Sequence, residues 1–502
     1  MRLDKVPFGP HGLHIDELGA AYDSFCISEY GVDQYLYKFP VYFKCFGEGQ
    51  NALYTYLAAI VFKIGGVSIF NFRLVAVICA VLAFIAMFFL VKEMIDVRYA
   101  LIALFLMTTM PAFMMSEHWG LECYLFLSFS IISMFFLIKG IVSGKMVCYL
   151  LSGVFWGITL YTYAITYIVV PPFLVLCLVY LVYIKRINPR QSLATGLPVI
   201  ILGVPLLIQQ LVMMDYIKPF EFMGIIDFWH PDFYRYSSIS VSYVPYNLLH
   251  SSWLILVTDG IPYNSNSTFG TIYYISVPFM LIGLYMAVIS GVRSIKDKAL
   301  NLWFVVLVFY LVARFAILFV EEPNTNRANV LFFPYLLFTV LGIKHIVEKV
   351  NRKWINIIIA LAYLLSFLCF SYWFYSYSGY RLASDVKGGM KVDTQCGEVL
   401  GYAREIANGK KICAIINEGW CTDLSMALFT ETSPYDYSND NDMENDTYNG
   451  VEWVLPETLD LSGDTIYVVD NALHHITDYM ITEGFSADYT YDEFTVVSYD
   501  TD

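Results

Sequence analysis

Long apolar runs constrain this chain more than any other feature of its sequence. A transmembrane helix needs about 20 consecutive, mostly apolar residues. Only 15% of the 502 residues are charged, against roughly 25% in ordinary soluble domains. The sequence therefore predicts an α-helical polytopic membrane protein with about ten spans, at residues 72–92, 99–115, 119–141, 146–165, 167–184, 195–214, 272–293, 299–320, 328–348 and 354–376.

The basic residues of the short loops indicate how these spans are oriented. Lys and Arg gather in every second loop, for example at Lys92 and Arg98 and again at Lys139 and Lys145. Positive charge is retained on the cytoplasmic side, so both termini and the other loops are predicted to lie outside. A chain that starts outside without a visible signal peptide is expected to have lost a first span upstream.

The C-terminal segment 377–502 differs from the rest in charge. It holds 24 acidic and 6 basic residues, a net charge of −18, whereas the whole chain has −14. Alternating apolar and helical patterns predict a small extracytoplasmic α/β domain, with helices near 396–408 and 474–484 and strands near 411–416, 465–470 and 494–499. This acidity, with no basic patch, argues against nucleic acid as a partner.

The segment 1–71 precedes the first apolar run and is predicted to be an extracytoplasmic loop. HIDELGAAYDSFCISEYG is typical of an amphipathic helix, and ALYTYLAAIVFKI of a short helix at the membrane surface, with a tilted or re-entrant segment as the alternative. Asp16 and Glu17 stand at the start of the first helix. Two interpretations are open: they cap the helix and complement its dipole, or one serves as a general base whose pKa is tuned by partial burial.

Two further charged residues stand at predicted span ends on the same face. Glu122 follows the polar hairpin SEHWG and falls within the next helix, where it is expected to face the protein interior. Arg327, beside amides in NTNRAN, is suited to a bidentate contact with phosphate. The alternative for Arg327 is an arginine whose side chain reaches the membrane interface.

Several motifs occur in an order that resembles a known family. HIDELGAAYD, PVYFKCFGEGQNALYTYL, SEHWGLECYLF, GITLYTYA and NTNRANVLFFP follow one another along residues 1–376. Together they resemble bacterial members of glycosyltransferase family 39. These are relatives of protein O-mannosyltransferases and lipid A aminoarabinose transferases, in the GT-C superfamily.

The resemblance implies transfer of a sugar from a polyprenyl phosphate to an acceptor on the non-cytoplasmic face, with inversion at the anomeric carbon. It implies that Asp16 is the general base, with Glu17 beside it and Glu122 as a second acidic residue. Arg327 would contact the donor phosphate, and the further candidates for this contact are Asn329, Gln50 and Tyr54. Members of the family often have Lys or His with paired prolines where this chain has residues 50–52.

The resemblance leaves the acceptor open among protein, lipid and cell-wall glycan. No metal ligands are predicted, although carboxylates with His14 or His118 could hold a divalent ion, because their spacing is not diagnostic. A second hypothesis is a transporter or flippase, which would place charges or broken helices near the bilayer midplane. A third is a non-catalytic membrane subunit with a partner-binding acidic tail. Membrane lipids are partners in all three.

Overall fold

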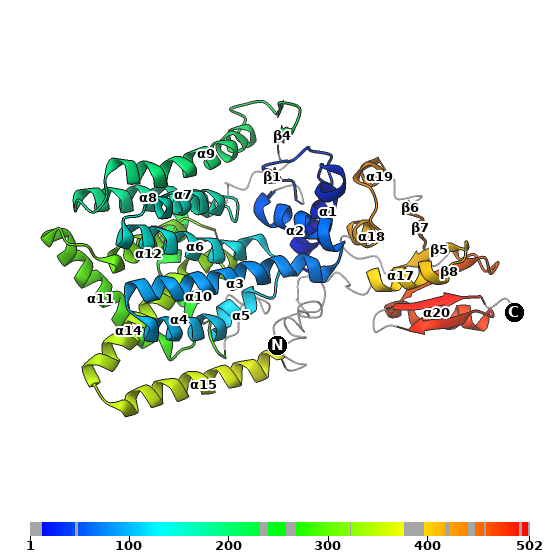
Figure 1. Ribbon diagram of the computed structural model, residues 1–502. Helices are drawn as coiled ribbons and strands as arrows, with labels where there is room; N and C mark the ends of the chain where they lie inside the picture. Colours follow the sequence, from blue (N-terminus) through cyan, green and yellow to red (C-terminus); the bar gives the residue numbers. More distant parts are fainter. Residues whose placement is uncertain are drawn as a thin grey trace.

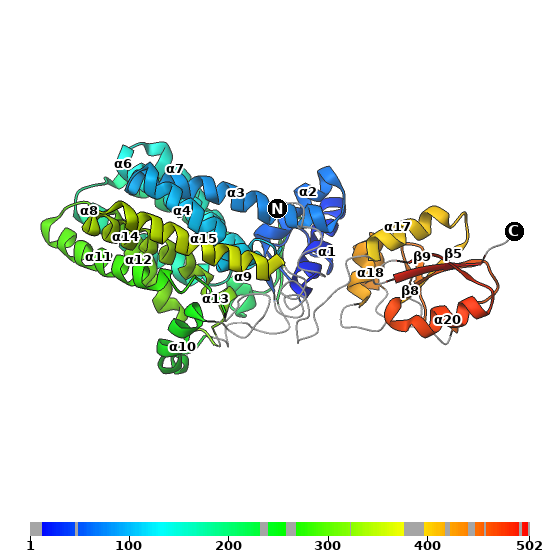
Figure 2. The ribbon, with the colours of Figure 1, turned by 90° about the horizontal axis from the view of Figure 1, so that it is seen from below.

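The computed structural model describes residues 13–45, 49–230, 239–257, 268–321, 323–375, 396–416, 422–439, 447–455, 458–490 and 494–499. Figure 1 shows a bundle of long helices, with α1 (Ile15–Tyr30) and α2 (Ala52–Gly65) at one end. A small α/β domain lies beyond these two helices, and Figure 2 shows the same order from below. Helices α1 and α2 therefore lie between the bundle and the C-terminal domain.

Seven of the described helices are long and apolar enough to cross a membrane, and three shorter ones account for the other predicted spans. The seven are α3 (Ile69–Met94), α6 (Glu122–Ser143), α8 (Thr166–Tyr183), α9 (Pro189–Met213), α11 (Ser276–Asp297), the helical segment Thr325–Val350 and α15 (Lys353–Tyr375). The shorter helices are α4 (Val97–Thr109), α7 (Met146–Thr159) and α12 (Leu302–Ile317).

The predicted span 99–115 is interrupted in the structure. Helix α4 ends at Thr109, and a separate short helix, α5 (Pro111–Ser116), follows. Met110 between them is extended, with φ −67° and ψ 141°, because a proline disfavours helical backbone at the residue before it.

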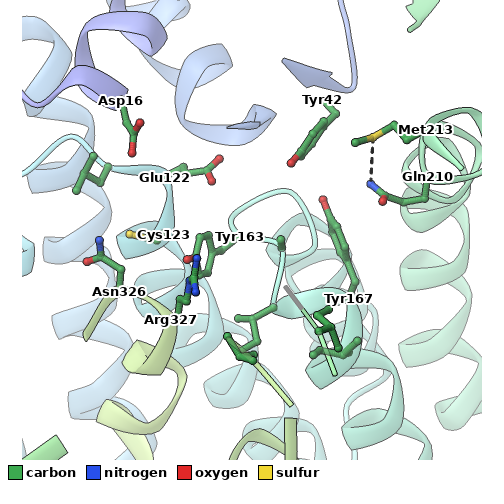
Figure 3. Close-up of a pocket in the computed structure, with 16 residues that line it drawn as sticks. Asp16, Tyr42, Glu122, Cys123, Tyr163, Tyr167, Gln210, Met213, Asn326 and Arg327 are labelled. Atoms are coloured by element: carbon green, nitrogen blue, oxygen red, sulfur yellow. Dashed lines mark hydrogen bonds between the residues drawn. The ribbon is translucent and has the colours of Figure 1, made fainter. Parts of the chain in front are cut away.

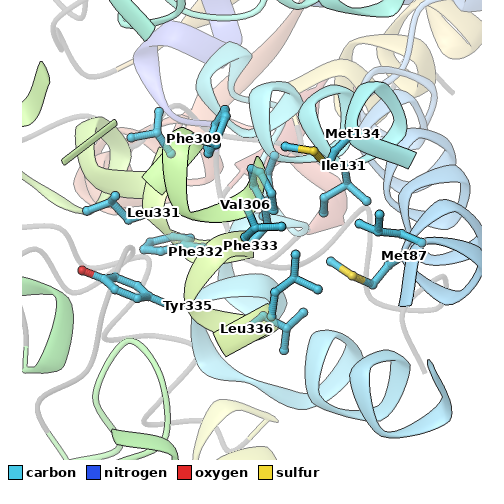
Figure 4. Packing of buried hydrophobic residues seen from close by; sticks show 14 of the residues in the cluster. Met87, Ile131, Met134, Val306, Phe309, Leu331, Phe332, Phe333, Tyr335 and Leu336 are labelled. Atoms are coloured by element: carbon cyan, nitrogen blue, oxygen red, sulfur yellow. The ribbon is translucent and has the colours of Figure 1, made fainter. Parts of the chain in front are cut away.

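The bundle core is built from apolar side chains of several helices. Figure 4 shows Met87 of α3, Ile131 of α6 and Phe309 of α12 packed around the start of α14 (Phe332–Val350). Close approach depends on glycine where α11 crosses α14. A Cβ added to Gly342 would lie 1.9 Å from the backbone oxygen of Phe279, so only glycine permits this packing.

Helix α1 is buried on nearly all sides, so it lacks the solvent-exposed polar face that the sequence-based prediction of an amphipathic helix implied. Ile15 and residues 17–27 are all buried, because α2 covers one side and the C-terminal domain another. Tyr22 donates a 3.0 Å hydrogen bond to the backbone oxygen of Thr432, and its ring contacts Tyr437 edge-on. The expected polar face is therefore an interface within the chain.

The C-terminal domain has the predicted α/β character. A six-stranded sheet runs in the order β6-β7-β5-β8-β10-β9, with β5 parallel to β7 and β8. The strands are β5 (Lys411–Ile415), β6 (Thr447–Tyr448), β7 (Val451–Trp453), β8 (Thr465–Asp470), β9 (Ser486–Thr490) and β10 (Phe494–Ser498). The helices are α17 (Cys396–Ile406), α18 (Thr422–Thr430), α19 (Pro434–Asn439) and α20 (His474–Thr482). Strands β6, β7 and β9, which the sequence pattern did not indicate, complete the sheet.

The connections on the α1 side of the bundle carry short elements of their own. β1 (Tyr42–Phe43) pairs with β2 (Gln50–Asn51), and β3 (Phe220–Phe222) pairs with β4 (Ile226–Phe228). Between α9 and α11 lies α10 (Val244–Leu256), preceded by a 3-10 turn, η2 (Val241–Tyr243). Before α14 come α13 (Thr325–Ala328) and a second 3-10 turn, η3 (Asn329–Leu331).

Candidate active site

A cavity opens where the N-terminal segment meets the helix bundle. The space between its lining atoms is about 1120 Å³ when its open mouth is included. Figure 3 shows Asp16 and Glu122 on one side and Arg327 on the other. The remaining lining residues are Tyr42, Leu121, Cys123, Tyr163, Ala164, Ile165, Tyr167, Ile168, Gln210, Met213, Ile239, Val320 and Asn326.

Asp16 reaches the cavity because of how α1 begins. His14 is the N-cap, and its Nδ1 accepts a 3.1 Å hydrogen bond from the Asp16 backbone N–H. The Glu17 carboxylate accepts a 3.0 Å bond from the His14 N–H in return, which completes a capping box. Ile15 and Glu17 are buried, while the Asp16 side chain is 48% exposed. Asp16 is thus the carboxylate of the pair that faces open space.

Glu17 lies behind the cavity wall and does not line it. One oxygen accepts hydrogen bonds from Arg73 Nε at 2.9 Å and from the Gly120 N–H at 2.5 Å. The other accepts from Arg73 Nη2 at 2.7 Å and from the His14 N–H. Arg73 itself is 1% exposed and lies against the Trp119 ring. This buried ion pair joins the start of α1 to α3 and to the polar hairpin.

Glu122 lines the cavity as the first residue of α6 and is held from behind. The Asn51 backbone N–H donates to its carboxylate, and the Asn51 side-chain amide lies 3.5 Å from the other oxygen. Tyr167 donates a 2.5 Å hydrogen bond to the Asn51 side-chain oxygen, which turns the amide nitrogen towards Glu122. Only 7% of Glu122 is exposed, so these contacts fix the direction of its carboxylate.

Arg327 lies on the short helix α13, capped by Asn324, whose side-chain oxygen accepts a 3.0 Å bond from the Arg327 N–H. Its guanidinium donates to the Glu321 backbone oxygen and faces the cavity. Beside it, the Asn326 side-chain oxygen accepts a 2.7 Å bond from the Tyr124 hydroxyl. Arg327 therefore brings a positive charge to the side of the cavity away from Asp16.

The other three predicted donor contacts do not line the cavity. Asn329 donates a 2.6 Å hydrogen bond to the Cys123 backbone oxygen. Gln50 donates to the Asp16 backbone oxygen at 3.3 Å. Tyr54 is buried and donates to the Phe72 backbone oxygen at 2.9 Å. Each of these side chains therefore holds residues around the site in place and does not line the cavity itself.

Sequence reasoning did not single out the aromatic lining of the cavity. Tyr42 and Tyr163 lie in the motifs PVYFKCFGEGQNALYTYL and GITLYTYA but were not given a role, and Tyr167 lies outside the motifs. Tyr42 is placed by Trp229, whose indole N–H donates a 2.5 Å bond to the Tyr42 backbone oxygen and whose ring stacks on it. A contact across 187 residues leaves no local pattern to read.

The cavity can support proton transfer and anion binding in one place. Asp16 is a partly solvated carboxylate that can accept a proton, and Arg327 can stabilise negative charge on a phosphate oxygen. Within the described ranges, no group of three or more His, Cys, Asp or Glu could hold a metal ion. Of the two histidines considered as ligands, His118 is buried against the Met114 backbone oxygen and His14 caps α1.

Comparisons with known proteins bear on the family and the fold of the chain. Residues 51–209 match the model of the dolichyl-phosphate-mannose-protein mannosyltransferase family. No curated protein sequence matches the chain. The structure of ArnT from Cupriavidus metallidurans in the apo state is similar, with a TM-score of 0.52, 10% identity, and coverage of 99% of this chain and 95% of ArnT.

The similarity to ArnT in the apo state shows that the chain has the GT-C fold. Two further structures are reported for comparison. ArnT bound to undecaprenyl phosphate gives a TM-score of 0.48 at 11% identity, covering 99% of this chain and 96% of ArnT. The apo oligosaccharyltransferase of Archaeoglobus fulgidus gives 0.42 at 14% identity, covering 81% of this chain. The present chain spans 57% of that archaeal protein's length.

The fold and the family-model match together support the interpretation drawn from the sequence, a GT-C glycosyltransferase similar to family 39. The predicted fold class is confirmed: the protein is a polytopic helical membrane protein with a small C-terminal α/β domain.

Proposed function

We propose that this protein transfers a sugar from a polyprenyl-phosphate donor to an acceptor on the non-cytoplasmic face of the membrane. The observation that carries the proposal is the cavity in which Asp16 and Glu122 face Arg327. Support comes from the mannosyltransferase family match over residues 51–209 and from the GT-C fold. ArnT, which has that fold, also has a solved structure bound to undecaprenyl phosphate.

In the proposed reaction Asp16 is the general base. It takes the proton from the acceptor hydroxyl or amine while the oxygen or nitrogen of that group forms a bond to the anomeric carbon. The bond between this carbon and the phosphate oxygen breaks at the same time, and its electron pair leaves with the phosphate. Arg327 stabilises the developing charge on that phosphate. Attack opposite to the leaving group inverts the anomeric carbon.

Glu122 and Glu17 take different parts in this proposal. Glu122 faces the cavity with its direction fixed through Asn51 and binds hydroxyl groups of the sugar or acceptor. Glu17 is a positioning residue, since both of its oxygens are already engaged by N–H donors outside the cavity. The segment 1–71 then acts as the catalytic loop and 377–502 as an extracytoplasmic accessory domain.

A divalent cation would find two carboxylates in the cavity, Asp16 and Glu122. Two carboxylates supply fewer oxygens than the six or more that Mg²⁺ or Ca²⁺ prefers. Such an ion would therefore take further oxygens from water or from the donor phosphate, and chelation with EDTA during transfer measures whether it contributes.

The test uses membranes that contain the full chain, isotope-labelled polyprenyl-phosphate sugars, and mass spectrometry of the products. Asp16→Asn keeps the shape of the side chain but removes the base, so transfer should fall by roughly 100-fold or more with unchanged membrane insertion. The matched control is Asp478→Asn, an exposed residue on α20 of the C-terminal domain, which should transfer normally.

Two outcomes would contradict the proposal. Normal transfer by Asp16→Asn would remove Asp16 from the chemistry. Movement of labelled lipid across the membrane without any glycosylated product would favour a transporter or flippase instead.

A further inference from the structure

The hairpin formed by β3 and β4 follows the end of span α9 within a few residues and exposes many large apolar side chains. Phe222 is 49% exposed, Met223 78% and Ile225 56%. The preceding segment is similar, with Tyr216 76% exposed. All three residues of β3 are exposed. An apolar patch of this kind marks a surface that another apolar phase covers.

The geometry of the hairpin tip holds these side chains outward. Phe222 pairs with Ile226, so residues 223–225 form a three-residue turn. Met223 has φ 52° and Gly224 has φ 75°. Left-handed backbone is unfavourable for a residue such as methionine, and Asn or Gly would be the usual choice there. The chain therefore keeps a long apolar side chain at a position where local turn chemistry disfavours it.

The base of the hairpin is fixed to the protein. Trp229, which follows β4, is 1% exposed and stacks between the rings of Tyr37 and Tyr42, at 5.6 and 6.4 Å. Gln209 of α9 donates a 2.7 Å hydrogen bond to the Trp229 backbone oxygen. The Asp227 side chain accepts a 2.7 Å bond from the backbone N–H of residue 38. The tip thus projects from a firmly held base.

The apolar tip continues the lipid-facing surface of α9. Helix α9 is long and apolar enough to cross a membrane, and only 28% of its most apolar stretch is buried. Figure 1 shows it along the outer edge of the bundle, with β4 beyond its end. Its exposed apolar side chains are Leu193, Leu197, Ile200, Ile201, Val204 and Leu207. The exposed apolar surface of α9 therefore leads towards the hairpin, with Asp215 and Lys218 exposed between them.

We propose that the tip of this hairpin, residues 222–225, inserts into the interfacial layer of the lipid bilayer beside α9. The occupant of the patch is lipid, since the patch adjoins a lipid-facing helix and carries aromatic and aliphatic side chains with a lysine next to it, as membrane-interface segments do. Trp229 and Tyr42 connect this anchor to the cavity wall. The inference does not depend on the proposed glycosyl transfer.

The experiment uses the full chain in phospholipid nanodiscs with an environment-sensitive fluorescent amino acid incorporated at one site at a time. The probe sites are Ile225 at the hairpin tip and Ile481 on α20, which are 56% and 46% exposed. Leu207 on α9 is the lipid-facing reference. Lipids that carry a nitroxide near the headgroup are then added to quench the probe.

At position 225 the probe should emit at shorter wavelength than at 481, and headgroup nitroxides should quench it at least several-fold more. Adding Met223→Asp should remove most of this difference, without a change in folding because that side chain is exposed. Equal spectra and equal quenching at 225 and 481 would overturn the proposal. Protection at 225 that rises with protein concentration and is insensitive to lipid nitroxides would overturn it too, in favour of a protein partner or a second copy.

Discussion

Replacing Glu17 by glutamine tests whether the two acidic residues at the start of α1 have different roles, with Asp16 as the proposed base and Glu17 as a positioning residue. Each Glu17 oxygen accepts two N–H donors, one of them from Arg73. In Glu17→Gln, an amide NH₂ replaces one of these oxygens. The NH₂ is itself a donor, so it cannot accept the two hydrogen bonds that this oxygen accepts. Arg73 also keeps its charge at 1% exposure without a counter-charge from residue 17.

The expected cost follows from that burial. Removing one partner of a buried, hydrogen-bonded ion pair destabilises a protein by about 3–5 kcal/mol, a large part of the roughly 5–15 kcal/mol that holds a typical domain folded. The matched control lies on the same helix: Glu29 pairs with Lys63 at 3.1 Å, with side chains 44% and 61% exposed. Glu29→Gln should therefore cost less than about 1 kcal/mol.

Thermal unfolding in detergent, followed by size-exclusion chromatography, measures both variants. Adding Arg73→Met to Glu17→Gln should restore much of the lost stability, because the unpaired buried charge is then gone. Activity of Glu17→Gln should fall with the stability, since the mutation loosens the start of α1 on which Asp16 stands. A Glu17→Gln protein as stable as the parent but unable to transfer sugar would refute this reasoning and make Glu17 a catalytic group.

Three further changes test other parts of the fold. Burial raises the pKa of Asp33 to about 7 from its ordinary 3.8, so the stability that protonated Asp33 contributes below about pH 4 is lost as the pH rises through 7. Asp33→Asn cannot ionise and should avoid about 2–4 kcal/mol of that loss, which is seen as a flatter profile of thermal midpoint against pH. Gly342→Ala should cost about 3 kcal/mol or more because its Cβ would meet the Phe279 backbone oxygen at 1.9 Å, whereas Gly196→Ala, with nothing within 4 Å, should leave the thermal midpoint unchanged. Tyr22→Phe leaves the buried backbone carbonyl of Thr432 without its 3.0 Å hydrogen bond. Amide hydrogen exchange in α18 should become faster, because the free energy that protects these amides falls by about 1–3 kcal/mol.

The helices of the bundle could be predicted because the bilayer imposes their length and composition. Every predicted apolar run corresponds to a helix, and even the break at Pro111 had a visible cause in the sequence. Helix α1 shows where such reasoning fails. Its burial depends on contacts such as that between Tyr22 and Thr432, which lie 410 residues apart, and no local periodicity reports them.

The candidate site could be predicted only in part for a similar reason. The sequence placed two carboxylates side by side at the start of a helix, but successive helical residues point about 100° apart. Which of Asp16 and Glu17 reaches the cavity depends on where Arg73 lies, and that arginine is on a different helix. Tyr42 and Tyr167 join the lining through contacts with Trp229 and Asn51. These partners lie far away in the sequence, so no local pattern shows that either tyrosine lines the cavity.

The charges around the cavity also orient the proposed donor. Among the described residues that line the cavity, Asp16 and Glu122 are the acidic ones, and Arg327 is the one Lys or Arg. A phosphate is attracted to Arg327 and repelled by the two carboxylates, which Figure 3 shows on the other side. The sugar of a bound donor would therefore point towards Asp16, with its phosphate at Arg327. The same repulsion disfavours a phosphate beside Asp16, where the acceptor nucleophile has to approach.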